Sequence, residues 1–210
     1  LSTEDQDYFS ERMQQYKDRG VVVICSDMEA VKHANNKYNL YSSAKEAGLN
    51  YPAFSLIDDI GTLDDIINSF GYPDKPFVIK QSQGRGGRGF HIIAKDMDSL
   101  REDDRKFFLE YGCLMDEPER YITKSNTMVC EYLPGDEYSI DAMSKEGKFY
   151  YAVVRKRFKS YGGLALEAEV IDDPGIVSLA KRTVESLNLS YINNIQAKED
   201  VNGVPKLMEI

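Results

Sequence analysis

The segment from residue 77 to residue 93 constrains the fold most. Two apolar runs, residues 77–80 and 90–93, flank a loop rich in glycine and arginine at residues 83–89. Short runs of β-branched and aromatic residues predict strands. Because the glycines carry no side chains, the backbone N–H groups of the loop can lie against a polyphosphate. The segment therefore predicts a strand, loop and strand that bind a nucleotide.

The loop differs from a P-loop, because it lacks a Gly-Lys-Ser/Thr ending and does not lead into a helix. Lys80 supports the nucleotide interpretation, since an ammonium on the first strand can bind α- and β-phosphate oxygens. Arg85 or Arg88 would add a second cation. An ordinary glycine-rich turn is one alternative. An RNA-binding Arg-Gly-Gly element is another, disfavoured because such elements occur in long unstructured tracts.

Composition limits the classes of partner. The chain has 26 Lys and Arg against 35 Asp and Glu, a net charge of -9. This balance disfavours nonspecific binding to nucleic acid or an anionic membrane, so an anion site has to be local. No apolar stretch approaches the roughly 20 residues of a membrane span. Three cysteines without metal-site spacing indicate buried free thiols: Cys25, Cys113 and Cys130. We expect a cytoplasmic protein.

The periodicity predicts an α+β fold. A buried strand is expected at residues 21–25, with a helix beginning after Ser26-Asp27. Further helices are expected at residues 36–47, 63–70, 99–112 and 174–187. Extended segments are expected at residues 128–132, 137–143, 149–155, 165–171, 191–198 and 204–210. We predict two mixed lobes, the second antiparallel, with a ligand cleft between them.

Three groups of polar residues lie outside the glycine loop. Glu131 and Glu137 flank a Pro-Gly break and can accept hydrogen bonds from an adenine amino group and ribose hydroxyls. Gln196 and Glu209 lie on the two strands of the last hairpin, and oxygen ligands of this kind suit Mg²⁺. A basic run at residues 154–159 is suited to an anionic substrate or a transferred phosphate. For each group, solvated polar side chains are the alternative.

Taken in order, these segments resemble the ATP-grasp superfamily, and most closely its carbamoyl-phosphate-synthase-like branch, from about Asp27 to Ile210. The resemblance implies two mixed α/β lobes with the nucleotide cleft between them. It implies that ATP is bound by Lys37, Lys80, Arg85, Gly86, Gly87, Glu131, Tyr132, Leu133 and Glu137. It places Mg²⁺ or Mn²⁺ at Gln196 and Glu209, and a glutamine at the first metal position favours the branch. Asn36 stands where an Asp is usual in the family.

The resemblance also implies a reaction. ATP would phosphorylate a small-molecule carboxylate, and an amine or ammonia would attack the acylphosphate. Arg157 and Arg155 are the candidates for binding the acylphosphate. A nucleotide-binding module without catalysis and another ATP-dependent phosphotransferase are the alternatives. The carboxylate, the nucleophile and the oligomeric state stay open, with a homo-oligomer among the alternatives.

The resemblance divides the chain into three parts. Residues 1–26 would be the remnant of a preceding α/β domain, residues 27–126 the N-terminal lobe and residues 127–210 the C-terminal lobe. The family continues past Glu-Ile with Asn-Pro-Arg, whereas this sequence stops at Ile210. We therefore expect a piece of a longer protein that binds magnesium-ATP weakly and turns over little or no substrate.

Overall fold

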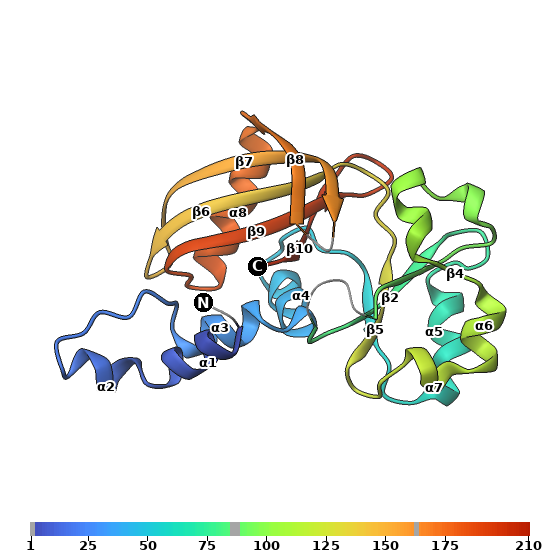
Figure 1. Cartoon of the computed structure of the whole chain (residues 1–210), viewed down its shortest axis with the longest axis horizontal. Coiled ribbons are helices and arrows are strands. Elements are labelled where there is room, and N and C mark those ends of the chain that lie inside the picture. Colours follow the sequence, from blue (N-terminus) through green and yellow to red (C-terminus); the bar gives the residue numbers. More distant parts are fainter. Residues whose placement is uncertain (1–2, 85–88, 162–163) are drawn as a thin grey trace. The chain divides into compact units, whose positions relative to one another are not determined.

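The computed structural model describes residues 3–84, 89–161 and 164–210. The chain folds into two compact units (Figure 1). Unit 1 comprises Leu1–Tyr51, Asp136–Glu199 and Gly203–Ile210, and unit 2 comprises Pro52–Gly135 and Asp200–Asn202. None of the described helices is long and apolar enough to cross a membrane.

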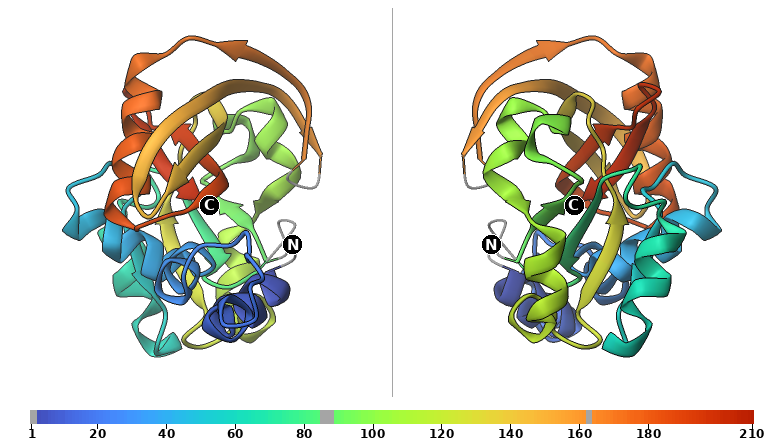
Figure 2. Two further views of the ribbon diagram at one scale, coloured as in Figure 1. Left: turned by 90° about the vertical axis from the view of Figure 1, so that its left-hand side faces the viewer. Right: turned by 90° about the vertical axis from the view of Figure 1, so that its right-hand side faces the viewer.

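Unit 1 is built on a five-stranded antiparallel sheet in the order β10-β9-β6-β7-β8. Its strands are β6 (Glu137–Lys145), β7 (Lys148–Tyr161), β8 (Leu164–Ile171), β9 (Tyr191–Glu199) and β10 (Pro205–Glu209). Figure 2 shows the strong curvature of β7 and β8, drawn in gold and orange. Glu146 and Gly147 form the turn between β6 and β7 with positive φ angles of 50° and 72°, as tight hairpins require.

One face of this sheet is apolar and packs against helix α8 (Pro174–Ser186). Ile140 is fully buried and lies opposite Val154 on β7 and Ile195 on β9. The helix begins at Asp173, whose carboxylate accepts hydrogen bonds from the N–H groups of Gly175 and Ile176. Its buried stripe consists of Ile176, Leu179, Ala180, Thr183 and Val184. Helix and sheet therefore share one apolar layer.

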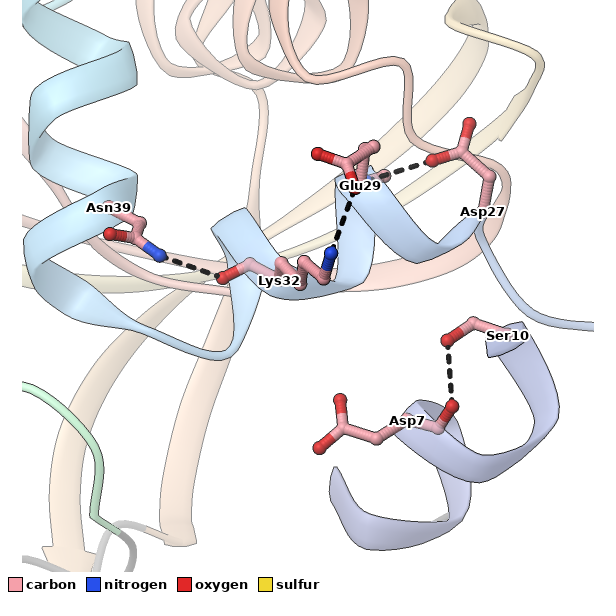
Figure 3. Close-up of polar contacts among 7 residues, drawn as sticks. Asp7, Ser10, Asp27, Glu29, Lys32 and Asn39 are labelled. Carbon is pink, nitrogen blue, oxygen red and sulfur yellow. Dashed lines mark hydrogen bonds and ion pairs between the residues drawn. The ribbon is translucent and has the colours of Figure 1, made fainter.

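The remaining helices of unit 1 are α1 (Thr3–Glu11), α2 (Met13–Lys17), α3 (Met28–Ala34) and α4 (Lys37–Glu46). Asp27 caps α3 by accepting a hydrogen bond from Ala30 N, and the Asn39 side chain on α4 donates to the Lys32 carbonyl on α3 (Figure 3). The buried Tyr41 of α4 donates its hydroxyl to the Met208 carbonyl at 2.9 Å. Helix α4 is thereby attached to β10.

Unit 2 contains a mixed five-stranded sheet in the order β1-β5-β2-β3-β4. All its strand pairs are antiparallel except β3 with β4. The strands are β1 (Phe54–Leu56), β2 (Phe77–Gln81), β3 (His91–Ile93), β4 (Phe108–Leu109) and β5 (Thr127–Glu131). The helical segments are η1 (Ile60–Thr62), α5 (Leu63–Ser69), η2 (Met97–Ser99), η3 (Glu102–Phe107), α6 (Tyr111–Asp116) and α7 (Pro118–Tyr121). Phe77 and Ile79 of β2 pack with α5 and α6 in the core of this unit.

Most of the predicted elements are confirmed. The helices at 36–47, 63–70 and 174–187 and the six extended segments all occur within a few residues of the expected bounds, although β7 extends to Tyr161. The strand at 21–25 is wrong, because no described strand pairs with it and Val22 and Ile24 are exposed. The helix at 99–112 is wrong too. Phe108 and Leu109 instead pair with Ile92 and Ile93 as a short strand.

The predicted burial of the cysteines holds for Cys25 and Cys130, whereas Cys113 is exposed. Strand β5 pairs with β2, and residues 127–135 belong to unit 2. The segment before residue 52 packs with the antiparallel sheet of unit 1. The lobes at 27–126 and 127–210, with a remnant at 1–26, stay predictions.

Candidate functional site

Part of the second face of the unit 1 sheet is polar. Because side chains alternate along a strand, Glu137, Ser139 and Asp141 lie on the face opposite Ile140. The register places Glu137 opposite Arg157, and Ser139 between Arg155 and Gln196. The predicted residues of three strands are therefore brought together on one face.

Arg157 is the most buried charged residue of this polar group. Its side chain is 3% exposed and its Nη1 lies 2.6 Å from Glu137 Oε1. The same nitrogen lies 3.4 Å from Gln196 Oε1. Removing a guanidinium from water is unfavourable unless it is paired, and Glu137 supplies that charge. The ion pair thus positions both Glu137 and Gln196, although Glu137 was predicted to bind ribose rather than an arginine.

Lys37 and Glu209 form the second group on unit 1. Lys37 Nζ lies 3.2 Å from Glu209 Oε2, and the carboxylate side chain is 40% exposed. Asn36 accepts hydrogen bonds from Tyr38 N and Asn39 N, which fixes Lys37 in the first turn of α4. Asn36 is therefore the helix cap, which an Asp would serve equally well.

The two predicted metal ligands are neighbours. A register shift after Leu207 places Glu209 opposite Gln196 on the adjacent strand. Residues 3–84, 89–161 and 164–210 hold no group of three or more His, Cys, Asp and Glu suited to a metal ion. A carboxylate and an amide oxygen are suitable ligands for a Mg²⁺ ion whose other ligands are phosphate oxygens and water. The donor chemistry therefore suits the predicted ion.

One polar cluster was missed by the sequence reasoning. Asp141 accepts a hydrogen bond from Arg155 Nη2 at 2.6 Å and another from Asn194 Nδ2 at 2.7 Å. Strand alternation was the available signal, because Asp141 shares a face with Glu137. Arg155 is thus bound to a carboxylate on β6, next to Arg157 and its partner.

The basic run at 154–159 is divided between the two faces of the sheet. Arg155 and Arg157 point to the polar face, whereas Lys156 lies between them and pairs with Asp136 at 2.6 Å. The hydrogen bond to Asp136 raises the pKa of Lys156. The basic residues of this run therefore lie on two faces of the sheet, and only Arg155 and Arg157 belong to the polar face.

In unit 2, Lys80 is 6% exposed and lies on β2 opposite Met128 of β5. Because Phe77 and Ile79 pack in the core, alternation turns Lys80 to the other face of this sheet. The predicted loop residues Arg85, Gly86 and Gly87 lie outside the described residues. The buried stem and terminal charge suit a lysine that binds an anion at the surface of the sheet.

The predicted adenine segment follows β5. Glu131 N donates to the Ala53 carbonyl, and Ala53 N donates to Glu131 Oε2, both at 2.9 Å. The structure thus gives the Glu131 carboxylate a backbone partner, where the prediction had an adenine amino group. Tyr132 donates its hydroxyl to Asp104 Oδ2 at 2.7 Å, and Leu133 is buried. The first residue after β5 is therefore bound through its side chain to η3.

Solved structures resemble the fold of this chain over nearly its whole length. D-alanine–D-alanine ligase from Bacillus anthracis, complexed with ATP, has 18% identity and a TM-score of 0.62, covering 94% of this chain and 61% of that chain. The ADP complex of N5-carboxyaminoimidazole ribonucleotide synthetase has 14% identity and a TM-score of 0.70, covering 97% and 51%. The ATP-grasp ligase PsnB, complexed with Mg and ADP, has 15% identity and a TM-score of 0.63, covering 96% and 56%. The chain has the ATP-grasp fold.

The sequence comparison agrees with this fold. Residues 123–210 match the family described as ATP-grasp in the biosynthetic pathway with Ter operon. No curated protein matches the sequence. The chain spans about half to three fifths of the length of the ATP-grasp structures it resembles. The predicted fold class, an α+β ATP-grasp fold with an antiparallel sheet, is confirmed.

Proposed function

We propose that this chain is the ATP-binding part of an ATP-dependent ligase that activates a carboxylate as an acylphosphate. The observation that carries the proposal is the placement of Glu209 opposite Gln196, with Lys37 at 3.2 Å from the Glu209 carboxylate. A carboxylate, an amide oxygen and an ammonium in one place match the requirements of a metal-bound polyphosphate. The ATP-grasp fold and the family matched at 123–210 support it.

Gln196 and Glu209 are the residues that would hold Mg²⁺, or Mn²⁺ in its place. The ion would neutralise charge on the phosphates that it binds. Lys37 pairs with Glu209 now, and its ammonium would bind a phosphate oxygen when ATP is present. Exchange of this kind is feasible because the Lys37 and Glu209 side chains are 19% and 40% exposed.

The arginines of β7 are proposed to bind the acylphosphate. Arg157 is buried against Glu137, so it would act with little loss of side-chain freedom, and it also holds Gln196. Arg155 is more exposed and lies beside Arg157 on the same face. Positive charge that is already in place stabilises negative charge that develops during phosphoryl transfer.

Other predicted residues would supply the remaining contacts with ATP. Lys80 would bind α- and β-phosphate oxygens together with Arg85, Gly86 and Gly87 of the glycine loop. The backbone at Tyr132 and Leu133 would meet adenine, and Glu137 at the start of β6 would bind ribose. The buried position of Lys80 supports its part, since a buried ammonium is worth more to an anion than one in water.

Gln196 favours the carbamoyl-phosphate-synthase-like branch among the ligases of this fold. On that basis the substrates are a small-molecule carboxylate and an amine or ammonia. Both D-alanine–D-alanine ligase and PsnB are named as ligases, which agrees with this reaction class.

Calorimetric titration of the chain with ATP, with and without Mg²⁺, tests the proposal. We expect Mg²⁺-dependent binding that Glu209→Gln weakens by about tenfold or more, equivalent to about 1.4 kcal/mol. Glu185→Gln on α8 is the matched control, because Glu185 is exposed and its contact with Lys181 is 3.9 Å. Binding that does not depend on Mg²⁺, or an equal effect of both substitutions, would contradict the proposed site.

A further inference from the structure

The segment from Tyr132 to Gly135 is braced at both ends by one turn of unit 2. The turn runs from Arg101 to Asp104 at the start of η3. Leu133, between the two braced ends, is 3% exposed. The chain passes into unit 1 directly after Gly135.

The first end of the brace is the Tyr132 hydroxyl. It donates to Asp104 Oδ2 at 2.7 Å. Burial, followed by the hydrogen bond to Asp104, raises the pKa of Tyr132, so the hydroxyl keeps its proton and stays a donor.

The second end is the Arg101 guanidinium. Its Nη1 lies 2.7 Å from the Pro134 carbonyl and 2.6 Å from the Gly135 carbonyl. Hydrogen bonds from a charged donor are stronger than those between neutral groups. Without Arg101, a Pro-Gly pair at the end of a strand would retain considerable backbone freedom. Arg101 therefore restrains the part of the segment that is most able to move.

We propose that Arg101 and Asp104 are positioning residues that hold the backbone of residues 132–135 in one conformation and thereby set the preference for adenine over guanine. The proposal rests on the proposed function, in which this segment meets the base. Adenine presents an amino donor at position 6, whereas guanine presents a carbonyl acceptor there. A backbone group held in place matches one and leaves the other unpaired. A backbone that is free to rotate accepts both and binds each more weakly.

If Arg101 only stabilised the fold, its loss would lower the unfolding temperature together with the nucleotide affinity. The hydrogen bonds of Arg101 are exposed, and exposed interactions of this kind contribute little to the stability of the fold. As a positioning residue, Arg101 should therefore affect nucleotide binding while the unfolding temperature stays nearly constant.

The test is calorimetric titration of the chain with magnesium-ATP and magnesium-GTP, together with thermal unfolding. We expect Arg101→Ala to weaken ATP binding by about tenfold and GTP binding by much less, so that base preference falls. Arg101→Lys should recover part of the loss, because an ammonium can also donate to both carbonyls. Tyr132→Phe removes only the hydroxyl and should act in the same direction. Arg120→Ala is the matched control, since Arg120 on α7 forms an exposed pair with Glu117.

The double variant Arg101→Ala/Tyr132→Phe shows whether the two ends act as one device. We expect the combined loss in ATP affinity to be smaller than the sum of the single losses, because breaking either end frees the same segment. The proposal is overturned if ATP and GTP weaken equally, if the unfolding temperature falls in step with affinity, or if Arg101→Ala matches Arg120→Ala. A wild-type chain that binds ATP with no preference over GTP also overturns it. A wild-type chain that binds neither nucleotide instead overturns the proposed function itself.

Discussion

Lys37 Nζ lies 3.2 Å from Glu209 Oε2, joining the first turn of α4 to the last strand of unit 1. Both side chains reach water, so the pair adds less than about 1 kcal/mol to stability. The pair therefore matters for ligand binding rather than for stability, because Glu209 lies opposite Gln196. An ammonium that is held beside a carboxylate by a helix cap is placed to exchange that partner for a phosphate.

Lys37→Ala is expected to separate binding from stability. The free energy of unfolding should change by less than about 1 kcal/mol, whereas affinity for magnesium-ATP should fall by about tenfold. Urea unfolding and calorimetry measure the two effects. Lys32→Ala is the control, because Lys32 forms an exposed pair with Glu29 on α3. Equal affinities for the two variants would remove Lys37 from the site.

Lys80→Met is expected to weaken ATP binding by about tenfold or more. Methionine keeps the buried apolar stem and removes only the charge, which makes it a cleaner change than alanine at a residue that is 6% exposed. Lys159→Met on β7 is the comparison, since Lys159 is an exposed residue. If calorimetry finds the same affinity in both variants, the assignment of Lys80 to the phosphates is wrong.

Arg157 and Arg155 should differ in their effect on stability. Arg157→Ala leaves Glu137 without its buried partner, and we expect a loss of about 2–3 kcal/mol in the free energy of unfolding. Arg155→Ala removes a pair in which both side chains are more than a third exposed, at 35% and 40%. We expect a loss of about 1 kcal/mol or less. Urea titration of both variants decides this. Similar losses would show that burial of Arg157 is not what stabilises its pair.

His91 is expected to make unit 2 less stable in acid. Burial lowers the pKa of His91, and its ring packs edge-on against Tyr121 with centroids 5.4 Å apart. As the pH falls below about 6.5, the unfolded chain takes up a proton at this histidine before the folded chain does. The unfolded state is then favoured, so stability falls with falling pH through this range.

His91→Phe keeps the ring contact and removes the titration. Urea unfolding of both proteins at about pH 7.5 and about pH 5.5 gives the acid loss of each, and the loss should be smaller for the variant. Identical losses would mean that other groups account for the acid sensitivity.

Local rules were enough for many of the elements and for the residue types at the site. The cap at Asp173, the alternation along β6 and the Glu146-Gly147 turn each act within a few residues of the chain. Local rules were not enough at residues 21–25, where an apolar run has no described strand beside it. They failed again at Phe108, which pairs with β3 rather than continuing a helix.

The sequence by itself determined most of the strands and helices, the strand position of Lys80 and the residue types at 196 and 209, because periodicity, caps and turns depend on near neighbours. Only the tertiary structure decided that Arg157 pairs with Glu137, that Asp141 joins Arg155 to Asn194, and that Arg101 restrains Pro134 and Gly135. These partners lie on different strands and turns. Their contacts follow from strand register and from packing over long separations in the chain, which local patterns do not specify.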